Sequence, residues 1–170
     1  MGLPRTLKNM TIFNEGLAYL GEVSSVTLPK LTRKLEEWRG GGMGGPVKLD
    51  MGQEALELEM TFGGPMRDIL RQYGVVGMAG VYLRFVGVYQ RDDSSSMDNI
   101  EIIIRGRHEE IDMGEAKPGE ISEFKVKTAV AYYKLVWGGV TEIEIDHINM
   151  VEIVSGVDRL AKQRGALGIF

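Results

Sequence analysis

ISEFKVKTAVAYYKLVWGGVTEIEIDHINMVEIV, residues 121–154, contains two long strand patterns that meet at Gly138 and Gly139. Between Phe124 and Val136 the even-numbered positions are mostly apolar or β-branched, whereas the odd-numbered positions begin as charged residues. A period of two is typical of a strand with one buried and one solvated face, and a glycine pair between two such strands indicates a hairpin turn. The sequence therefore predicts a long β-hairpin.

The second face of the first strand becomes apolar towards the turn, so we expect this end to be covered on both sides. The residues concerned are Ala129, Ala131, Tyr133, Leu135 and Trp137. If residues 121–137 are all extended, they span about 56 Å at roughly 3.3 Å each, far beyond an ordinary strand. We expect such a strand either to bend across two sheets or to reach a neighbouring molecule.

After the turn, Ile143 and Ile145 alternate with acidic residues, and the phase of the pattern changes at His147. A change of phase moves the apolar residues to the other face of a strand. The sequence therefore predicts a bulge or the start of a new strand at His147.

Composition limits the possible classes of protein. The chain has 170 residues, 44% hydrophobic composition, no cysteine and a formal net charge of −4. We expect one domain spanning residues 1–170, kept in the cytoplasm, because no run approaches the ~18 to 20 apolar residues of a membrane span. The lack of cysteine excludes disulfides and thiolate metal sites, and mild acidity disfavours a surface that grips nucleic acid. Twenty-three glycines and five prolines indicate a turn-rich β protein.

Further strands follow from local patterns. The tripeptide at residues 14–16 (NEG) predicts a first hairpin. Leu56, Leu58, Met60 and Phe62 alternate with polar residues, which predicts a half-buried strand with an acidic outer face. Residues 81–90 are apolar at nearly every position, as in a central strand, and a polar loop at 91–99 leads to a return strand from Ile100.

Residues 31–38 fit both a helix and a strand, because Leu31, Leu35 and Trp38 have helical spacing while the alternation also suits a strand. The glycine-rich loop at 40–46 spells GxGxxG at Gly40, Gly42 and Gly45. A phosphate-binding loop needs a helix start after it, whereas a strand pattern follows here, so we interpret the segment as a mobile loop.

Two short helices are predicted. Pro65 and the spacing of Met66, Ile69, Leu70 and Tyr73 indicate a one-sided helix that covers a β core and stops at Gly74. Asp158 is suited to cap a second helix that runs through Arg164 and ends at Gly165. This helix has a narrow apolar side, so it must dock on a sheet or on a neighbouring subunit.

Catalytic and metal-binding constellations are not evident. His108 lies among charged residues and is interpreted as a surface residue, whereas His147 is interpreted as structural. Glu57 and Glu59 could form a carboxylate pair, but a solvated strand face is the commoner explanation. The aspartates at 92, 93 and 98 lack calcium-loop spacing. We therefore expect no enzyme activity, no cofactor and no metal.

Separated segments together resemble the major tail tube protein of contractile-tailed phages, a family related to R-type pyocin tube proteins. The resemblance covers nearly the whole chain in the same order. The segments are residues 25–36 (SVTLPKLTRKLE), 39–45 (RGGGMGG), 89–93 (YQRDD), 105–107 (RGR) with 110–112 (EID), 132–135 (YYKL), 144–146 (EID) with 148–150 (INM), and 156–160 (GVDRL).

The resemblance implies a mainly β fold, a small antiparallel β-sandwich or partial barrel with a flanking short helix and a short C-terminal helix, similar to the tube protein of type VI secretion. It implies rings of six copies, stacked into a hollow tube inside a contractile sheath, through which DNA passes without specific binding. Implied partners are the chain itself, the sheath, the baseplate or initiator and the tape measure protein. Assembly is expected in the host bacterial cytoplasm and the product in the virion tail. The resemblance also favours a strand, and not a helix, at residues 31–38.

Within this framework the sequence suggests three groups of assembly residues. The apolar stretch Ala129, Ala131, Tyr133, Leu135 and Trp137 is the candidate ring-forming strand. Candidate contacts between rings are the loop residues Gly40, Gly41, Gly42, Met43, Gly44, Gly45, Met113, Gly114 and Lys117. Candidate acidic residues of the lumen are Glu57, Glu59, Glu142 and Glu144, although an outward solvated face explains them equally well.

Other functions remain open at this point. A tube subunit of an R-type bacteriocin or a type VI-like secretion apparatus would have the same pattern, and only neighbouring genes would distinguish it. A β-sandwich enzyme or a carbohydrate-binding β-sandwich is a more distant alternative, since fold does not fix function.

Overall fold

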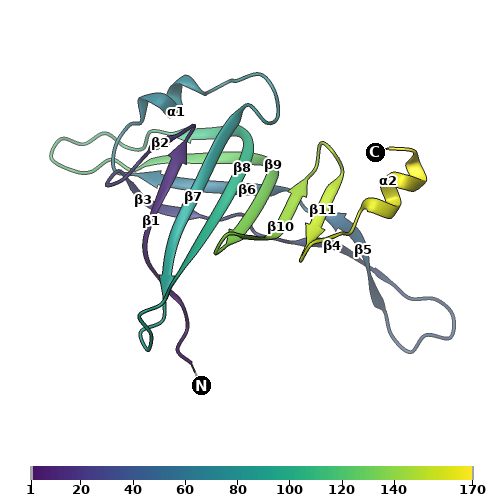
Figure 1. Ribbon diagram of the computed structural model, residues 1–170. Helices are drawn as coiled ribbons and strands as arrows, with labels where there is room; N and C mark the ends of the chain where they lie inside the picture. The colour runs from purple at the N-terminus through teal and green to yellow at the C-terminus, as the bar shows by residue number, and fades with distance from the viewer. Residues whose placement is uncertain (1, 170) are drawn as a thin grey trace.

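The computed structural model describes residues 2–169, and within them the chain is mainly β with two short helices (Figure 1). The strands are β1 Thr6–Asn14, β2 Leu17–Ala18, β3 Val23–Thr27, β4 Arg33–Trp38, β5 Val47–Gln53, β6 Leu56–Phe62, β7 Val81–Gln90, β8 Met97–Asp112, β9 Phe124–Trp137, β10 Val140–Asp146, β11 Val151–Val154 and β12 Val157–Asp158. The helices are α1 Arg67–Arg71 and α2 Ala161–Leu167. The predicted antiparallel β fold with short helices is confirmed.

In the described residues, ten strands form one sheet and β4 pairs with β5 separately. The main order is β12-β11-β10-β9-β8-β7-β1-β2, with β6 added to β9 and β3 added to β6. β9 therefore has different neighbours along its length. Its first half pairs with β6 and its second half with β10, while β8 accompanies it throughout.

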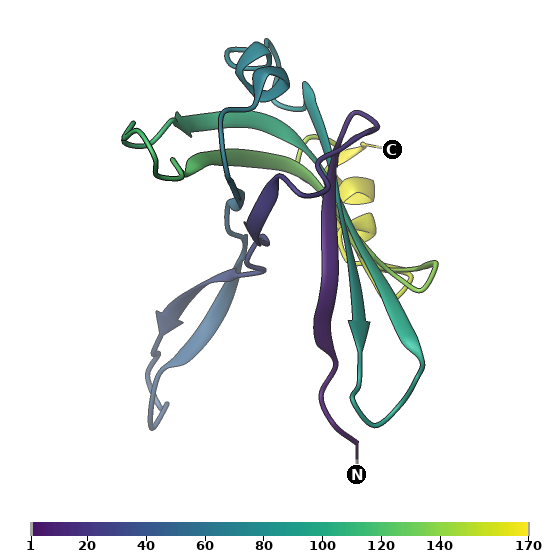
Figure 2. The same cartoon turned by 90° about the vertical axis from the view of Figure 1, so that its left-hand side faces the viewer.

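The long strands β8 and β9 bend from one layer of the sandwich into the other (Figure 2). The pairing register shifts between Arg105 and Gly106, which leaves Ala131 in a β-bulge. A Cβ atom at Gly106 would lie 1.9 Å from the carbonyl oxygen of Ala129, so only glycine permits the strands to approach this closely. Of the two expected outcomes for the long strand, bending across two sheets is the one observed.

The bulge changes which face of β9 is buried. Val130 and Tyr133 both point into the core, with 8% and 2% of their surfaces exposed. The strict period of two placed Tyr132 on the buried face, and that prediction is wrong. Tyr132 instead lies half-buried on the other face, where its hydroxyl donates a hydrogen bond to Glu144 Oε2 at 2.7 Å.

The core fills the space between the two layers, and α1 closes one side of it. Phe62 contacts both Tyr19 and Phe124 in edge-to-face arrangements, with ring centroids 5.4 and 6.1 Å apart. Every apolar residue of the predicted β6 alternation is buried, while Glu57 and Glu59 are exposed. The fully buried large side chains are Tyr19, Tyr133, Phe62, Phe124, Ile12, Leu56, Leu58, Met60, Ile69, Leu83, Ile104 and Val81.

The predicted turns are confirmed. Gly138 and Gly139 adopt φ values of 57° and 85°, which a two-residue hairpin loop between right-twisted strands requires. The NEG turn joins β1 and β2. At the predicted phase change β10 ends at Asp146, and a turn that includes His147 leads into the new strand β11.

The pair β4–β5 projects from the sandwich as a separate two-stranded extension (Figures 1 and 2). We call β4, β5 and the intervening loop 39–46 the arm. The ambiguous stretch at residues 31–38 is therefore a strand and not a helix from Arg33 onward.

Both helices differ in detail from the prediction. In α1 only Ile69 is buried, whereas Leu70 is 38% and the following Tyr73 66% exposed, so the expected apolar side is wrong for these two residues. α2 begins at Ala161 and continues past Gly165 to Leu167, and Gly168 ends it with a φ of 75°. Asp158 does not cap the helix itself; its Oδ1 accepts the N–H of Leu160, one residue before the first turn.

Candidate assembly surfaces

One face of the arm is apolar and exposed. Trp38 lies opposite Val47, and Leu49 lies opposite Glu36 in the same register, so these residues share a face with Met51. Trp38, Val47, Leu49 and Met51 expose 58%, 47%, 46% and 54% of their surfaces. The other face carries Leu35, Asp50 and the pair formed by Glu37 and Lys48. A two-stranded pair with an uncovered apolar face is only marginally stable in water, so a partner that covered this face would stabilise the arm.

Arg33 joins the root of the arm to the sandwich. Its guanidinium donates to Glu152 Oε1 on β11 at 2.6 Å and to Asp50 Oδ2 on β5 at 2.9 Å. Hydrogen bonds from Gly52 N–H and then from Arg33 lower the pKa of Asp50, and the bonds to Glu152 and Asp50 raise the pKa of Arg33. Arg33 and Asp50 expose 37% and 52% of their side chains, so their contact adds little stability, whereas Glu152 is only 15% exposed and anchors the root of the arm more firmly.

The glycine-rich loop lies at the far end of the arm. Gly40 accepts a hydrogen bond from Met43 N–H through its carbonyl, and Arg39 Nε donates to the carbonyl of Met43. An added Cβ at Gly41, Gly42, Gly44 or Gly45 would meet nothing within 4 Å. The loop joins two antiparallel strands and precedes no helix, which agrees with rejecting the phosphate-loop interpretation.

A second loop connects β8 to β9. Gly114 N–H donates to Asp112 Oδ1, Ser122 Oγ donates to the carbonyl of Glu115, and Glu120 N–H donates to the carbonyl of Lys117. Met113 is 51% exposed and Lys117 Nζ lies 3.7 Å from Glu115 Oε1. Its internal hydrogen bonds give this loop a defined shape.

The four candidate lumen carboxylates fall into two groups. Glu57 and Glu59 lie on β6, beside the first half of β9, whereas Glu142 and Glu144 lie on β10, beside its second half. Glu142 and Glu144 are only partly exposed, and Glu144 accepts the hydroxyl of Tyr132. Burial and this carboxylate raise the pKa of Tyr132.

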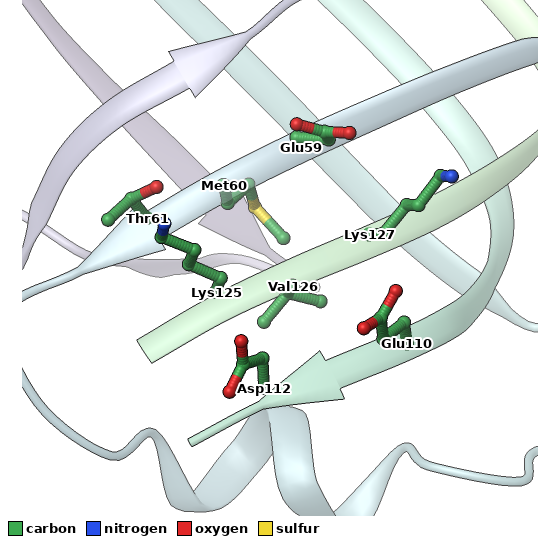
Figure 3. Close-up of a pocket in the computed structure, with 8 residues that line it drawn as sticks. All are labelled: Glu59, Met60, Thr61, Glu110, Asp112, Lys125, Val126 and Lys127. Carbon is green, nitrogen blue, oxygen red and sulfur yellow. The ribbon is translucent and has the colours of Figure 1, made fainter. Parts of the chain in front are cut away.

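The β6 group lies beside a hollow of about 200 Å³ with mixed charge (Figure 3). Lys127 lies between Glu59 on β6 and Glu110 on β8, and Lys125 lies between Thr61 and Asp112. Lys127 Nζ is 3.4 Å from Glu57 Oε2, and this carboxylate is the main cause that raises the pKa of Lys127. Sequence reasoning identified the acidic row but not the lysines that lie between the acids.

The candidate ring-forming strand has no free edge. Both edges of β9 are hydrogen-bonded inside the chain, to β8 and to β6 or β10. Tyr133 lies in the subunit core with 2% of its surface exposed, so its side chain is not available to a neighbouring copy. Ala129, Ala131 and Leu135 are half-buried, and Trp137 is 37% exposed beside Arg5, whose guanidinium carbon is 5.3 Å from its ring centroid.

Open edges occur elsewhere in the described residues. β1 pairs with β2 only through Phe13 and Asn14, which leaves the outer edge of residues 6–12 without a strand partner. β3 pairs only with β6. Sequence reasoning missed these edges because a strand pattern does not reveal how many neighbours the strand has.

A buried polar network contradicts the interpretation of His108 as a surface residue. Only 6% of His108 is exposed. Its Nδ1 lies 2.9 Å from Thr128 Oγ1 and its Nε2 lies 3.0 Å from Gln72 Oε1, while Gln72 exchanges two 2.8 Å hydrogen bonds with Asn14. Burial lowers the pKa of His108 to about 4, so it is neutral at pH 7. His147 is exposed in its turn.

Comparison with known proteins identifies the family. Residues 4–168 match the model of the family described as phage tail tube protein FII. The chain belongs to the phage tail tube protein FII family.

Relatives of this tail tube family member cover nearly its full length. The tail tube protein of Escherichia phage P2 is 46% identical over 172 residues, which are 99% of this chain and 100% of that protein. The major tail tube protein of Serratia phage KSP20 is 38% identical over 153 residues, which are 89% of this chain and 88% of that protein.

The fold is also found in solved structures at very low sequence identity. A chain in a cryo-EM structure of an extracellular contractile injection system, the PVC sheath/tube terminator in the extended state, aligns with a TM-score of 0.59. The alignment has 8% identity and covers 78% of this chain and 96% of that chain. A chain of the PVC sheath-tube complex in the extended state also aligns with a TM-score of 0.59. That alignment has 9% identity and covers 78% of this chain and 91% of that chain.

Two structural features are absent from residues 2–169. No three His, Asp or Glu side chains gather there in an arrangement that could hold a metal ion. No helix in this range is long and apolar enough to cross a membrane.

Proposed function

We propose that this chain is the structural subunit of the tail tube of a contractile-tailed phage. Six copies close into a ring, and rings stack into a hollow tube inside a contractile sheath. The observation that carries the self-assembly is the arm, whose apolar face of Trp38, Val47, Leu49 and Met51 is uncovered in the single chain. Full-length similarity to the tail tube protein of phage P2 supports assembly into a tail tube in particular.

Open strand edges support ring formation. An unpaired edge invites pairing with another chain, and a closed ring satisfies such edges without leaving new ones. The outer edges of β1 and β3 are open in the described residues, and β8 beyond Gly106 has a strand partner on one side only. β9 contributes to ring contacts through the side chains of Ala129, Ala131, Leu135 and Trp137, since its own edges are occupied.

Loops at two places supply the contacts between rings. One is the arm loop with Gly40, Gly41, Gly42, Met43, Gly44 and Gly45, and the other includes Met113, Gly114 and Lys117. A glycine-rich loop that becomes ordered on stacking loses conformational entropy, and this cost delays polymerisation until an initiating platform is present.

The lumen is acidic and does not hold its cargo. Carboxylates along a narrow channel repel phosphates, so DNA passes at ejection without specific binding. Glu57, Glu59, Glu142 and Glu144 are the proposed lining residues, and the net charge of −4 agrees with this role. Lys125 and Lys127 reduce the field at the β6 group, and Lys134, the cross-strand partner of Glu144, reduces it at the β10 group.

The proposed partners are further copies of the chain, the sheath, the baseplate or initiator and the tape measure protein. The subunits assemble in the cytoplasm of the host bacterium and remain in the virion tail. The role is structural, so the subunit needs neither a catalytic set nor a cofactor.

Negative-stain microscopy and light scattering of the purified protein test this proposal. We expect rings and hollow rods that grow with protein concentration. A protein that stays monomeric at high concentration, with or without a tail initiator complex, contradicts the proposal.

A further inference from the structure

The loop between β8 and β9 and the C-terminal helix have complementary surfaces. We call residues 112–123 the acidic loop: it holds four carboxylates and one lysine, a formal charge of −3. Its most exposed large apolar residue is Ile121, with 82% of its surface accessible. Glu115 lies 3.7 Å from the Nζ atom of Lys117, and Glu123 lies 3.3 Å from that of Lys125. Both ion pairs are exposed to solvent, so they neutralise little of the negative field of the loop.

We call five exposed residues in and around β12 and α2 the C-terminal patch: Val157, Arg159, Lys162, Leu167 and Ile169. Its apolar members expose 56%, 64% and 48% of their surfaces, in the order Val157, Leu167 and Ile169. Arg159 and Lys162 are exposed and form no ion pair within residues 2–169. The patch therefore combines uncovered apolar surface with two positive charges. The acidic loop also exposes an apolar residue, but its charge has the opposite sign.

α2 needs a cover that the subunit does not provide. It has seven residues, and none of them is buried. A helix of this length is marginal in water without tertiary packing. Arg164 nevertheless holds it in a fixed position, since its guanidinium donates to the carbonyl of Met150 at 2.9 Å and also pairs with Asp158. The helix is thus presented at the surface with its apolar residues uncovered.

The two surfaces lie at opposite ends of the molecule (Figure 1), where the acidic loop projects beyond the β8–β9 end and α2 lies beyond β11. One chain cannot bring them together, but two copies can. A contact between different surfaces of identical subunits repeats head to tail, which suits stacking along a tube.

We propose that the acidic loop of one copy docks on the C-terminal patch of a second copy. Ile121 packs against Leu167 and Ile169, and the carboxylates of the loop face Arg159 and Lys162. This inference rests on the proposed tube function and assigns a partner surface to the loop that contains Met113, Gly114 and Lys117.

Cysteine cross-linking tests the contact directly, because the native chain has no cysteine. Ile121→Cys and Leu167→Cys chains are mixed under assembly conditions and oxidised mildly. A disulfide requires Cα atoms within about 7 Å, so docking predicts an efficient mixed dimer on a non-reducing gel. Ser95→Cys, in an exposed loop outside both surfaces, replaces Leu167→Cys in the control mixture.

Charge reversal provides a second readout. Glu120→Lys with Glu123→Lys in one chain, or Arg159→Glu with Lys162→Glu in another, should reduce the mixed dimer at least tenfold. A chain with both pairs reversed should recover most of it. Rods that form while Ile121→Cys cross-links to Leu167→Cys no better than to Ser95→Cys overturn this inference and leave the tube function intact. Absence of rods in the unmodified protein, even with a tail initiator complex present, overturns both.

Discussion

His108 Nε2 lies 3.0 Å from Gln72 Oε1, and this contact joins β8 to the residue that ends α1. Gln72 Oε1 also accepts a hydrogen bond from Asn14, so it must act as an acceptor and His108 must donate from Nε2. Nδ1 is then free to accept the hydroxyl of Thr128. Neutral histidine in this tautomer satisfies both contacts of the ring.

The subunit should therefore lose stability in mild acid. With a pKa of about 4 in the folded state and 6.5 when unfolded, the unfolded chain takes up the proton first as pH falls. Stability decreases between pH 6.5 and 4, by about 3 kcal/mol at ~1.4 kcal/mol per pKa unit, and this contribution is constant below pH 4. Urea unfolding of dilute subunit over this range measures the effect.

His147→Gln should retain that pH dependence, because His147 is exposed, whereas His108→Gln should lose the histidine contribution. An equal pH slope in the His108→Gln chain and the unmodified chain would contradict the buried neutral histidine.

The inward direction of His108 was detectable in the sequence. It continues the even-numbered positions of Ile102, Ile104 and Gly106, all of which face the core. Its charged neighbours instead suggested the surface. Alternation predicted β6 and the hairpin at Gly138 for the same physical reason, since one face of each strand must be buried. It failed at Tyr132, because the bulge at Ala131 of β9, opposite Gly106 of β8, shifts the register there, and a local pattern does not contain this long-range contact.

Gly106→Ala should severely destabilise the fold. The new methyl group would lie 1.9 Å from a backbone oxygen that cannot move without separating β8 from β9. We expect a loss of more than about 2 kcal/mol in the free energy of unfolding, as for other clashes in packed regions. Gly45→Ala is the matched control, because an added Cβ there meets nothing within 4 Å. Equal stability of the two variants in urea would show that the close approach of β8 and β9 at position 106 does not require glycine.

Polar substitutions on the apolar face of the arm should separate folding from assembly. Trp38→Ser with Leu49→Thr removes exposed apolar surface, so we expect the unfolding free energy to change by less than about 0.5 kcal/mol while rods disappear. Leu35→Ser, on the opposite face of the same strand pair, is the control. Sedimentation measures assembly and circular dichroism measures folding. Normal rods from the double variant would exclude this face as an assembly surface.

Shortening the glycine loop tests its role between rings. Replacing residues 40–45 with a two-residue turn leaves the β4–β5 pairing intact, and the loop makes only local contacts, so the subunit should stay folded. We expect rings but no rods in negative stain. Removing two serines from the exposed loop at 94–96 should leave rod growth unchanged. Rods of normal length from the shortened-loop variant would refute the inter-ring role.

Reversing charge at the proposed lumen should affect the passage of DNA more than assembly. Glu142→Lys with Glu57→Lys and Glu59→Lys replaces repulsive groups with cations, each of which attracts phosphate, so DNA should be retained. Glu144 is left unchanged because it accepts the hydroxyl of Tyr132. We expect tails of normal appearance and at least a tenfold fall in infectivity that partly recovers in high salt, which screens the new attraction. The control chain carries glutamine at the same three positions and should remain infective. Equal infectivity of the lysine and glutamine chains would place these residues outside the lumen.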